Sequence, residues 1–175
     1  MPSPASPSAA LPIAHVVLRV LIVLNWLAGA AVAMLLVATP ASRWLLRAYH
    51  LSPSPDADRL IMAWRAIAAV FLVAIPLHYV VLKRLLAIVE TVRAGDPFVA
   101  ANAVHLQAIA WALLVLQLLS LIVGAIARAV STPAHPLHLR AGFSISGWLA
   151  VLLTFLLARV FAEGALMRED LEGTV

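Results

Sequence analysis

Four apolar stretches, each long enough to cross a bilayer, dominate the 175-residue sequence. An α-helix rises ~1.5 Å per residue and the hydrocarbon core is ~30 Å thick, so about 20 apolar residues span it. Because backbone N–H and C=O groups find no water in lipid, each stretch is expected to be a helix. The sequence therefore predicts an all-α fold, a bundle of four transmembrane helices. The predicted spans are residues 15–38, 60–82, 106–127 and 143–161.

Composition narrows the class of protein further. Sixty-four per cent of the residues are hydrophobic and 11% are charged, which excludes an ordinary soluble domain. We expect a disordered N-terminal segment at 1–14, a membrane domain at 15–162 and a C-terminal tail at 163–175. Cysteine is absent, which excludes disulfides and thiolate chemistry. The net charge of +4 comes from cations near helix ends, which favours lipid headgroups over direct nucleic-acid binding.

The first two spans carry local signals for packing and length. Gly29 lies among alanines and Asn25 lies four residues earlier, which predicts a close helix contact with an interhelical hydrogen bond. Pro76 inside the second span predicts a kink. Beyond residue 82 the apolar pattern continues at helical spacing, with Leu86 and Val89 on one side. Helix two is therefore expected to continue to about residue 93 as a cytoplasmic amphipathic extension.

A corner follows this extension. Gly95 can adopt the left-handed conformation that closes a helix. Asp96 is expected to cap the next helix, with Pro97 at its first position. Phe98 is expected to staple the turn to the extension. The pattern predicts a helix–tight turn–helix corner that leads through Asn102 into the third span.

The corner, followed by Asn102 and Leu106, resembles a bacterial four-helix membrane-protein family known as domain of unknown function 2975 (DUF2975). The C-terminal sequence at 160–164, with Leu166 and the acidic pair at 169–170, is similar to that family's ending. The residues at 170–175 depart from its usual tail. The resemblance implies a bacterial inner-membrane protein without an established enzymatic role. Family members are often encoded beside a small helix-turn-helix regulator, which implies a membrane partner for that regulator.

We therefore expect a cytoplasmic docking surface built from the extension, the corner and the C-terminal tail. Leu86, Val89 and Phe98 would supply apolar contact, while Arg93 and Glu163 would set the register. The alternative is that the apolar stripe lies on lipid headgroups. The complete candidate set is Leu86, Val89, Arg93, Gly95, Asp96, Pro97, Phe98, Asn102, Glu163 and Gly164.

Histidines offer a second function, a haem- or quinone-linked electron carrier. His15, His78 and His105 are expected near one membrane edge, and His78 with His105 would hold a haem between helices two and three. The competing interpretation is that they are interfacial side chains with a polar tip in water. We favour this interpretation and expect no cofactor.

Other chemistry is weakly supported. His50, His135 and His138 could hold zinc or copper, but a solvated loop explains them better because no carboxylate or thiolate joins them. Arg19 and Arg65 lie about one turn inside their spans, close enough to reach headgroups. No acid lies inside a span, which argues against a third function, a small-molecule transporter. No catalytic grouping emerges, so we do not expect an enzyme.

Cations are nearly balanced between the two sides of the membrane, and orientation depends on a few of them. The adjacent Lys83 and Arg84 favour a multi-pass arrangement in the bacterial inner membrane with both termini cytoplasmic. The sequence leaves homo-oligomerisation open.

Overall fold

The computed structural model describes residues 10–38, 55–131 and 141–172. All regular structure in these ranges is helical, and each of the four helices is long and apolar enough to cross a membrane. This confirms the predicted all-α class and a multi-pass membrane protein. The helices are α1 (Ala10–Ala38), α3 (Pro55–Arg93), α4 (Ala100–Val130) and α5 (Ile145–Glu172).

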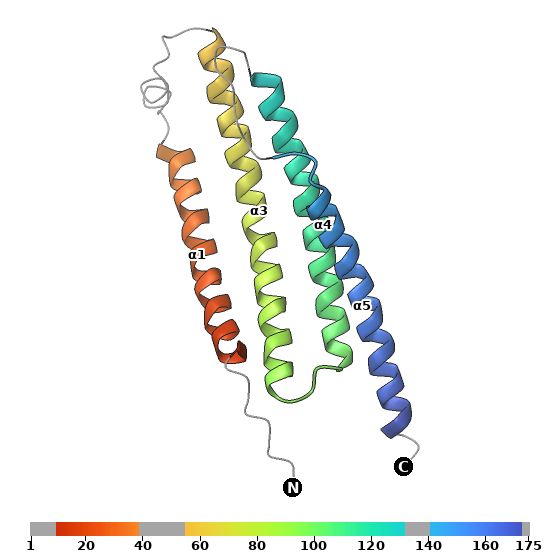
Figure 1. Cartoon of the computed structure of the whole chain (residues 1–175). Helices are drawn as coiled ribbons and strands as arrows, with labels where there is room; N and C mark the ends of the chain where they lie inside the picture. The colour runs from red at the N-terminus through yellow and green to blue at the C-terminus, as the bar shows by residue number, and fades with distance from the viewer. Residues whose placement is uncertain (1–9, 39–54, 132–140, 173–175) are drawn as a thin grey trace.

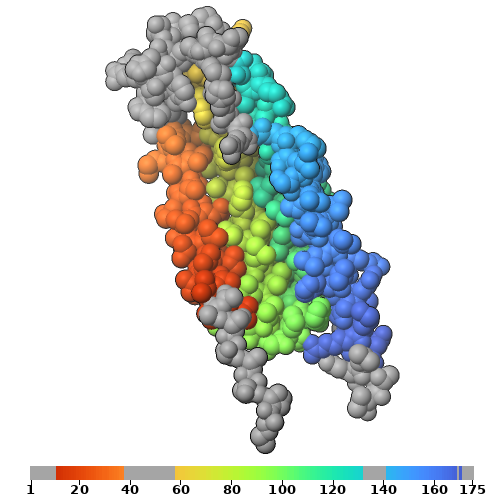
Figure 2. Space-filling view, in the orientation of Figure 1, coloured from red at the N-terminus to blue at the C-terminus, as the bar shows by residue number. Residues whose placement is uncertain are grey.

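The helices lie side by side in chain order, as a row (Figure 1). Within the described ranges, α1 packs on α3, α3 on α4 and α4 on α5, and helices further apart in the row do not touch. Figure 2 shows α1 and α5 as the outer edges, with α3 and α4 between them. The buried apolar residues accordingly lie mainly on the two inner helices and include Leu60, Ile67, Leu106, Ile109 and Ala110.

Small residues bring neighbouring helices together, as the first span predicted. A Cβ atom on Gly29 would lie 3.1 Å from the side chain of Ile75 on α3. Beside it, Asn25 Nδ2 donates a hydrogen bond of 3.1 Å to the carbonyl oxygen of Ile75. Such contacts matter in lipid, where apolar surface gives helices no preference for each other over acyl chains. Close approach at Gly29 and the Asn25 hydrogen bond therefore both contribute to the α1–α3 contact.

Two helices extend further than the sequence indicated. α1 begins at Ala10, inside the segment 1–14 predicted to be disordered, because Pro12 is tolerated in a first helical turn. α5 runs to Glu172, through most of the region 163–175 predicted as a tail. α3 passes through Pro76 and continues unbroken to Arg93, which confirms the predicted helical extension.

The extension of α3 is packed between its neighbours and does not project alone. His15 Nδ1 on α1 lies 3.9 Å from Glu90 Oε1, and Arg84 Nη1 lies 3.1 Å from His105 Nδ1 on α4. Along the helix axes, the start of α1 and the end of α5 thus lie at the same end of the bundle as the turn after α3 (Figure 1). We call this part the corner end and define it as residues 10–18, 85–104 and 160–172.

Candidate docking site at the corner end

A closed helix terminus builds the corner. Gly95 has φ of 87°, the left-handed conformation that the sequence predicted. Its N–H donates to the carbonyl of Val92 at 3.1 Å, and the N–H of Asp96 donates to the carbonyl of Thr91 at 3.1 Å. This pair of bonds is the Schellman arrangement, which satisfies carbonyls left over at a helix end. Because a side chain with a Cβ is disfavoured at this φ, glycine fixes where α3 stops.

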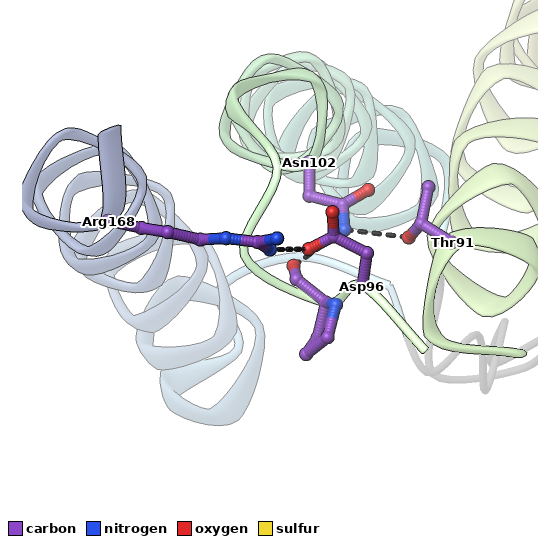
Figure 3. A network of polar contacts seen from close by, with 5 residues as sticks. Thr91, Asp96, Asn102 and Arg168 are labelled. Carbon is purple, nitrogen blue, oxygen red and sulfur yellow. Dashed lines mark hydrogen bonds and ion pairs between the residues drawn. The ribbon is translucent and has the colours of Figure 1, made fainter. Parts of the chain in front are cut away.

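The start of α4 differs from the prediction. The helix begins at Ala100, and its N-cap is Val99, whose apolar side chain cannot cap it. The expectation that Asp96 caps this helix, with Pro97 in its first position, is therefore wrong. The physical reason is that the Asp96 amide closes α3, while its carboxylate forms an ion pair with Arg168 of α5 (Figure 3).

Asn102 links the end of α3, the corner and the first turn of α4. Its Nδ2 donates to Thr91 Oγ1 at 2.7 Å and to the carbonyl of Pro97 at 2.8 Å (Figure 3 shows the Thr91 bond). Thr91 Oγ1 in turn donates to the carbonyl of Ile88 at 2.8 Å. Asn102 is 0% exposed, so it positions the corner and is not itself a contact surface for a partner. Its Oδ1 accepts no hydrogen bond from the described residues.

Phe98 connects the corner to α5. Its ring lies 5.4 Å, centroid to centroid, from the ring of Phe161, so the structure places it against α5. A Cβ on Gly164 would lie 3.3 Å from Phe98 Cδ1, closer than ordinary van der Waals contact, so glycine lets the ring pack close to α5. Nearby, Arg159 Nε donates to Glu163 Oε1 at 2.7 Å, one helical turn away. The ring contact and the Asp96–Arg168 pair together dock α5 on the corner.

The predicted docking residues differ in what they expose. Phe98 is 47% exposed, and Arg93, Gly95 and Glu163 are also exposed. Asp96, Pro97 and Gly164 are half-buried, as are Leu86 and Val89, which lie in the packed part of α3. Sequence reasoning missed part of this surface, because a helical tail was not expected. The additional exposed apolar side chains at the corner end include Val104, Val160, Leu166 and Met167.

Basic side chains of α1, α3 and α5 lie at one depth. Two contacts set the register of α1 against α3: Trp26–Tyr79, with ring centroids 5.6 Å apart, and His15–Glu90. On α1, Arg19 lies between His15 and Trp26. On α3, Lys83 and Arg84 lie between Tyr79 and Glu90.

Contacts of α4 and α5 place Arg159 and His105 at the same depth. Arg159 lies between Phe155, which contacts Trp111, and Phe161, which contacts the corner. His105 of α4 lies at the same level, beside Arg84 of α3. We call the set Arg19, Lys83, Arg84 and Arg159 the basic belt.

The histidines of the haem hypothesis take separate partners. His78 is exposed, and its Nδ1 lies 2.8 Å from the carbonyl oxygen of Ala74 in its own helix. His105 of α4 lies beside Arg84 of α3. Arg84 is six residues, or about 9 Å, further along α3 than His78. His15, which is level with Glu90, lies further still, so the three do not share one depth.

The described residues also form no metal-binding cluster. No three His, Asp or Glu side chains gather to hold a metal ion in the described ranges. His50, His135 and His138 lie outside the described residues.

Comparison with known proteins identifies the family. The chain matches the family described as "Protein of unknown function (DUF2975)" over residues 14–175. It therefore belongs to that family, as the corner and the C-terminal sequence indicated. No curated protein and no solved structure matches the chain.

Proposed function

We propose that this member of the DUF2975 family is a membrane-anchored docking partner for a small helix-turn-helix transcriptional regulator. The regulator binds at the corner end, which faces the cytoplasm of a bacterial cell. The observation that carries the proposal is that three apolar side chains, Phe98, Leu166 and Met167, are exposed in a part of the molecule that extends past the basic belt.

Helix geometry supports this position relative to the membrane. Arg65 and Arg84 are nineteen residues apart on α3, or about 28 Å, close to the ~30 Å thickness of the hydrocarbon core. The basic belt then marks one face of that core, where Lys and Arg side chains meet headgroups. From Arg84, α3 continues to Arg93, about 14 Å further. Exposed apolar side chains at that height are not covered by acyl chains, and such patches commonly mark contact sites.

The chemistry of the surface suits a protein partner. Phe98 and Met167 provide apolar area, and Arg93 and Glu163 provide exposed charges around it. Protein interfaces commonly combine an apolar centre with a polar rim. The buried Asn102 network holds the corner in one conformation before binding, which lowers the entropic cost of association. The kind of regulator follows from the resemblance to the family and not from the geometry.

Co-purification from mild detergent with the regulator encoded beside the gene tests the docking. Phe98→Asp should reduce the retained regulator by about thirtyfold, since a central apolar anchor contributes ~2 kcal/mol or more. Met167→Asp, at a side chain that is 63% exposed, tests the same surface without removing the Phe98–Phe161 contact. Ile13→Asp is the matched control because Ile13 is 61% exposed at the same end, on the opposite edge of the row.

Two results would contradict the docking proposal. The first is that the unmodified protein retains no regulator. The second is that the Phe98 and Met167 variants retain as much regulator as the Ile13 variant. Helix content and melting temperature, compared across the three variants, separate a lost contact from a lost fold.

The orientation has its own test, which uses the absence of cysteine from the sequence. Met167→Cys places one thiol at an exposed site of the corner end, and Met62→Cys places one near the opposite end of α3. In spheroplasts, a membrane-impermeant maleimide should label Met62→Cys at once and Met167→Cys only after lysis. Labelling of Met167→Cys before lysis would place the corner end outside the cell.

A further inference from the structure

Arg84 of α3 and His105 of α4 meet through their side chains. Arg84 Nη1 lies 3.1 Å from His105 Nδ1, and both side chains are half-buried. A guanidinium carries only N–H donors and keeps its charge throughout the physiological pH range. Arg84 therefore donates and His105 Nδ1 accepts, which requires Nδ1 to carry no proton. In this contact His105 is the neutral imidazole, with its proton on Nε2.

His78 shows the opposite arrangement. Its Nδ1 lies 2.8 Å from the carbonyl oxygen of Ala74. Because a carbonyl oxygen can only accept, Nδ1 of His78 is the nitrogen that carries the proton. A second proton on His78 leaves that bond in place, since Nδ1 still donates. A second proton on His105 removes the acceptor that Arg84 needs.

Protonation of His105 would also place two positive charges side by side, and its surroundings offer no compensation. On α3, Lys83 is next to Arg84 in the sequence, and on α5 the level of His105 is marked by Arg159. On α4 itself the next charged side chain is Arg128, twenty-three residues away. Three carboxylates of the corner end face other groups, in the pairs His15–Glu90, Asp96–Arg168 and Arg159–Glu163.

The Arg84–His105 contact lies close to the network that holds the corner. His105 follows Asn102 by three residues, about one turn of α4, and Arg84 precedes Thr91 by seven residues, about two turns of α3. Asn102 and Thr91 join the same two helices through a hydrogen bond of 2.7 Å. Separation of α3 from α4 at His105 therefore acts on the frame that carries the corner.

We propose that the Arg84–His105 contact is a pH-sensitive latch between α3 and α4, closed while His105 is neutral and opened when it takes up a proton. The closed latch binds no proton at His105, whereas an imidazole in the open or unfolded chain binds one near its ordinary pKa of ~6.5. The stability that the latch contributes is therefore complete well above this pH and is lost as the pH falls below it. Acidification of the cytoplasm would then loosen the corner end. Weaker retention of the regulator in acid is a consequence that rests on the docking proposal.

Nitrogen-15 NMR of the imidazole rings tests the latch without any regulator. The full chain, labelled at histidine, is placed in phosphatidylglycerol nanodiscs, and the variants His105→Asn and His78→Asn assign the two signals. At about pH 7.5, one unit above the ordinary pKa, His105 should carry its proton on Nε2 and His78 should carry it on Nδ1. A proton on Nδ1 of His105 at that pH would overturn the proposal, because Arg84 could not donate to it.

Hydrogen exchange measures the opening. Protection factors, which are corrected for the intrinsic pH dependence of exchange, are compared at about pH 7.5 and about pH 5.5, on either side of the ordinary pKa. Those of the amides at 99–106 should fall about tenfold in acid, the effect of one lost hydrogen bond to a charged group. His15 works in the opposite direction, since its protonation adds a charge beside Glu90.

Three variants assign the pH dependence to the latch. His105→Asn places an amide oxygen near the position of Nδ1 and cannot titrate, so its protection factors should be the same at both pH values. Arg84→Gln should also remove the difference, because a glutamine amide can donate or accept. His78→Asn is the matched control and should keep the tenfold fall. A full fall in His105→Asn, or no fall in the unmodified protein, would overturn the latch.

Retention of the regulator at the same two pH values tests the consequence for docking. The unmodified protein should release regulator in acid, whereas His105→Asn should retain it. Equal release from both proteins would show that the latch does not control docking. Retention of no regulator at either pH would contradict the docking proposal alone, because the NMR and exchange measurements decide on the latch separately.

Discussion

Replacing Asn102 by alanine tests whether one buried amide holds the corner together. The change removes hydrogen bonds of 2.7 and 2.8 Å to Thr91 Oγ1 and to the Pro97 carbonyl. Each contributes about 1 kcal/mol net, and the Pro97 carbonyl also loses a partner, so we expect a loss of about 2–3 kcal/mol in the free energy of unfolding. The missing side-chain atoms leave a small cavity in the same place. On the proposed placement the corner end lies past the hydrocarbon core, so values measured in water apply.

The assay combines thermal unfolding in detergent with hydrogen exchange at the corner amides. Thr91→Val, which keeps the shape and removes only one of the two bonds of Asn102, should cost about 1 kcal/mol, and the double variant should be less than additive. Gln107→Ala is the control, since this amide is exposed on the same helix and should change stability by less than ~0.5 kcal/mol. Asn102→Ala with the stability and exchange rates of the control would refute the reasoning.

Two more predictions concern helix packing and the attachment of α5. Gly124→Ala would put a Cβ 2.6 Å from the Cα of Gly142, so backbone must move, and thermal unfolding should show a loss of ~1–3 kcal/mol. Gly29→Ala meets only side-chain atoms at 3.1 Å and should be milder; equal losses would count against the packing argument. Asp96→Asn breaks the pair with Arg168 and should speed hydrogen exchange in the last turns of α5, most at low salt, for a loss below ~1 kcal/mol. Arg168→Gln should then add nothing, and additive effects would show that the two residues act separately.

The features that the sequence predicted well are those governed by local chemistry. Four apolar stretches become four helices because lipid leaves the backbone no other way to satisfy its polar groups. Gly95 marks the end of α3 because few other residues tolerate its φ of 87°. Asn25 and Gly29 predicted a close interhelical contact, since a polar amide and a missing side chain inside a span have few other uses. In each case, the neighbours along the chain carry the signal.

Features that depend on residues far apart in sequence were not predictable in the same way. Aspartate is a common residue at helix N-caps, but the carboxylate of Asp96 pairs with Arg168, seventy-two positions later. The helix α4 starts at Ala100 instead. The sequence did not single out Thr91, because a threonine near a helix end is common and only the fold brings Asn102 to its hydroxyl. The acidic character of the last residues suggested a tail, whereas contacts with the corner accompany a helix that runs to Glu172.

Different forces hold the helices together in the apolar spans and at the corner end, and the difference bears on the proposed partner binding. Between the apolar spans, helices approach through glycines and exchange isolated hydrogen bonds, such as that from Asn25, which is how helices associate in lipid. At the corner end, a Schellman turn, a buried amide with two bonds and an ion pair occur within a few residues. A scaffold of this kind is rigid, and it leaves Phe98 47% exposed. Since a rigid frame around an exposed apolar ring lowers the entropic cost of binding, the corner end is where substitutions should separate binding from folding.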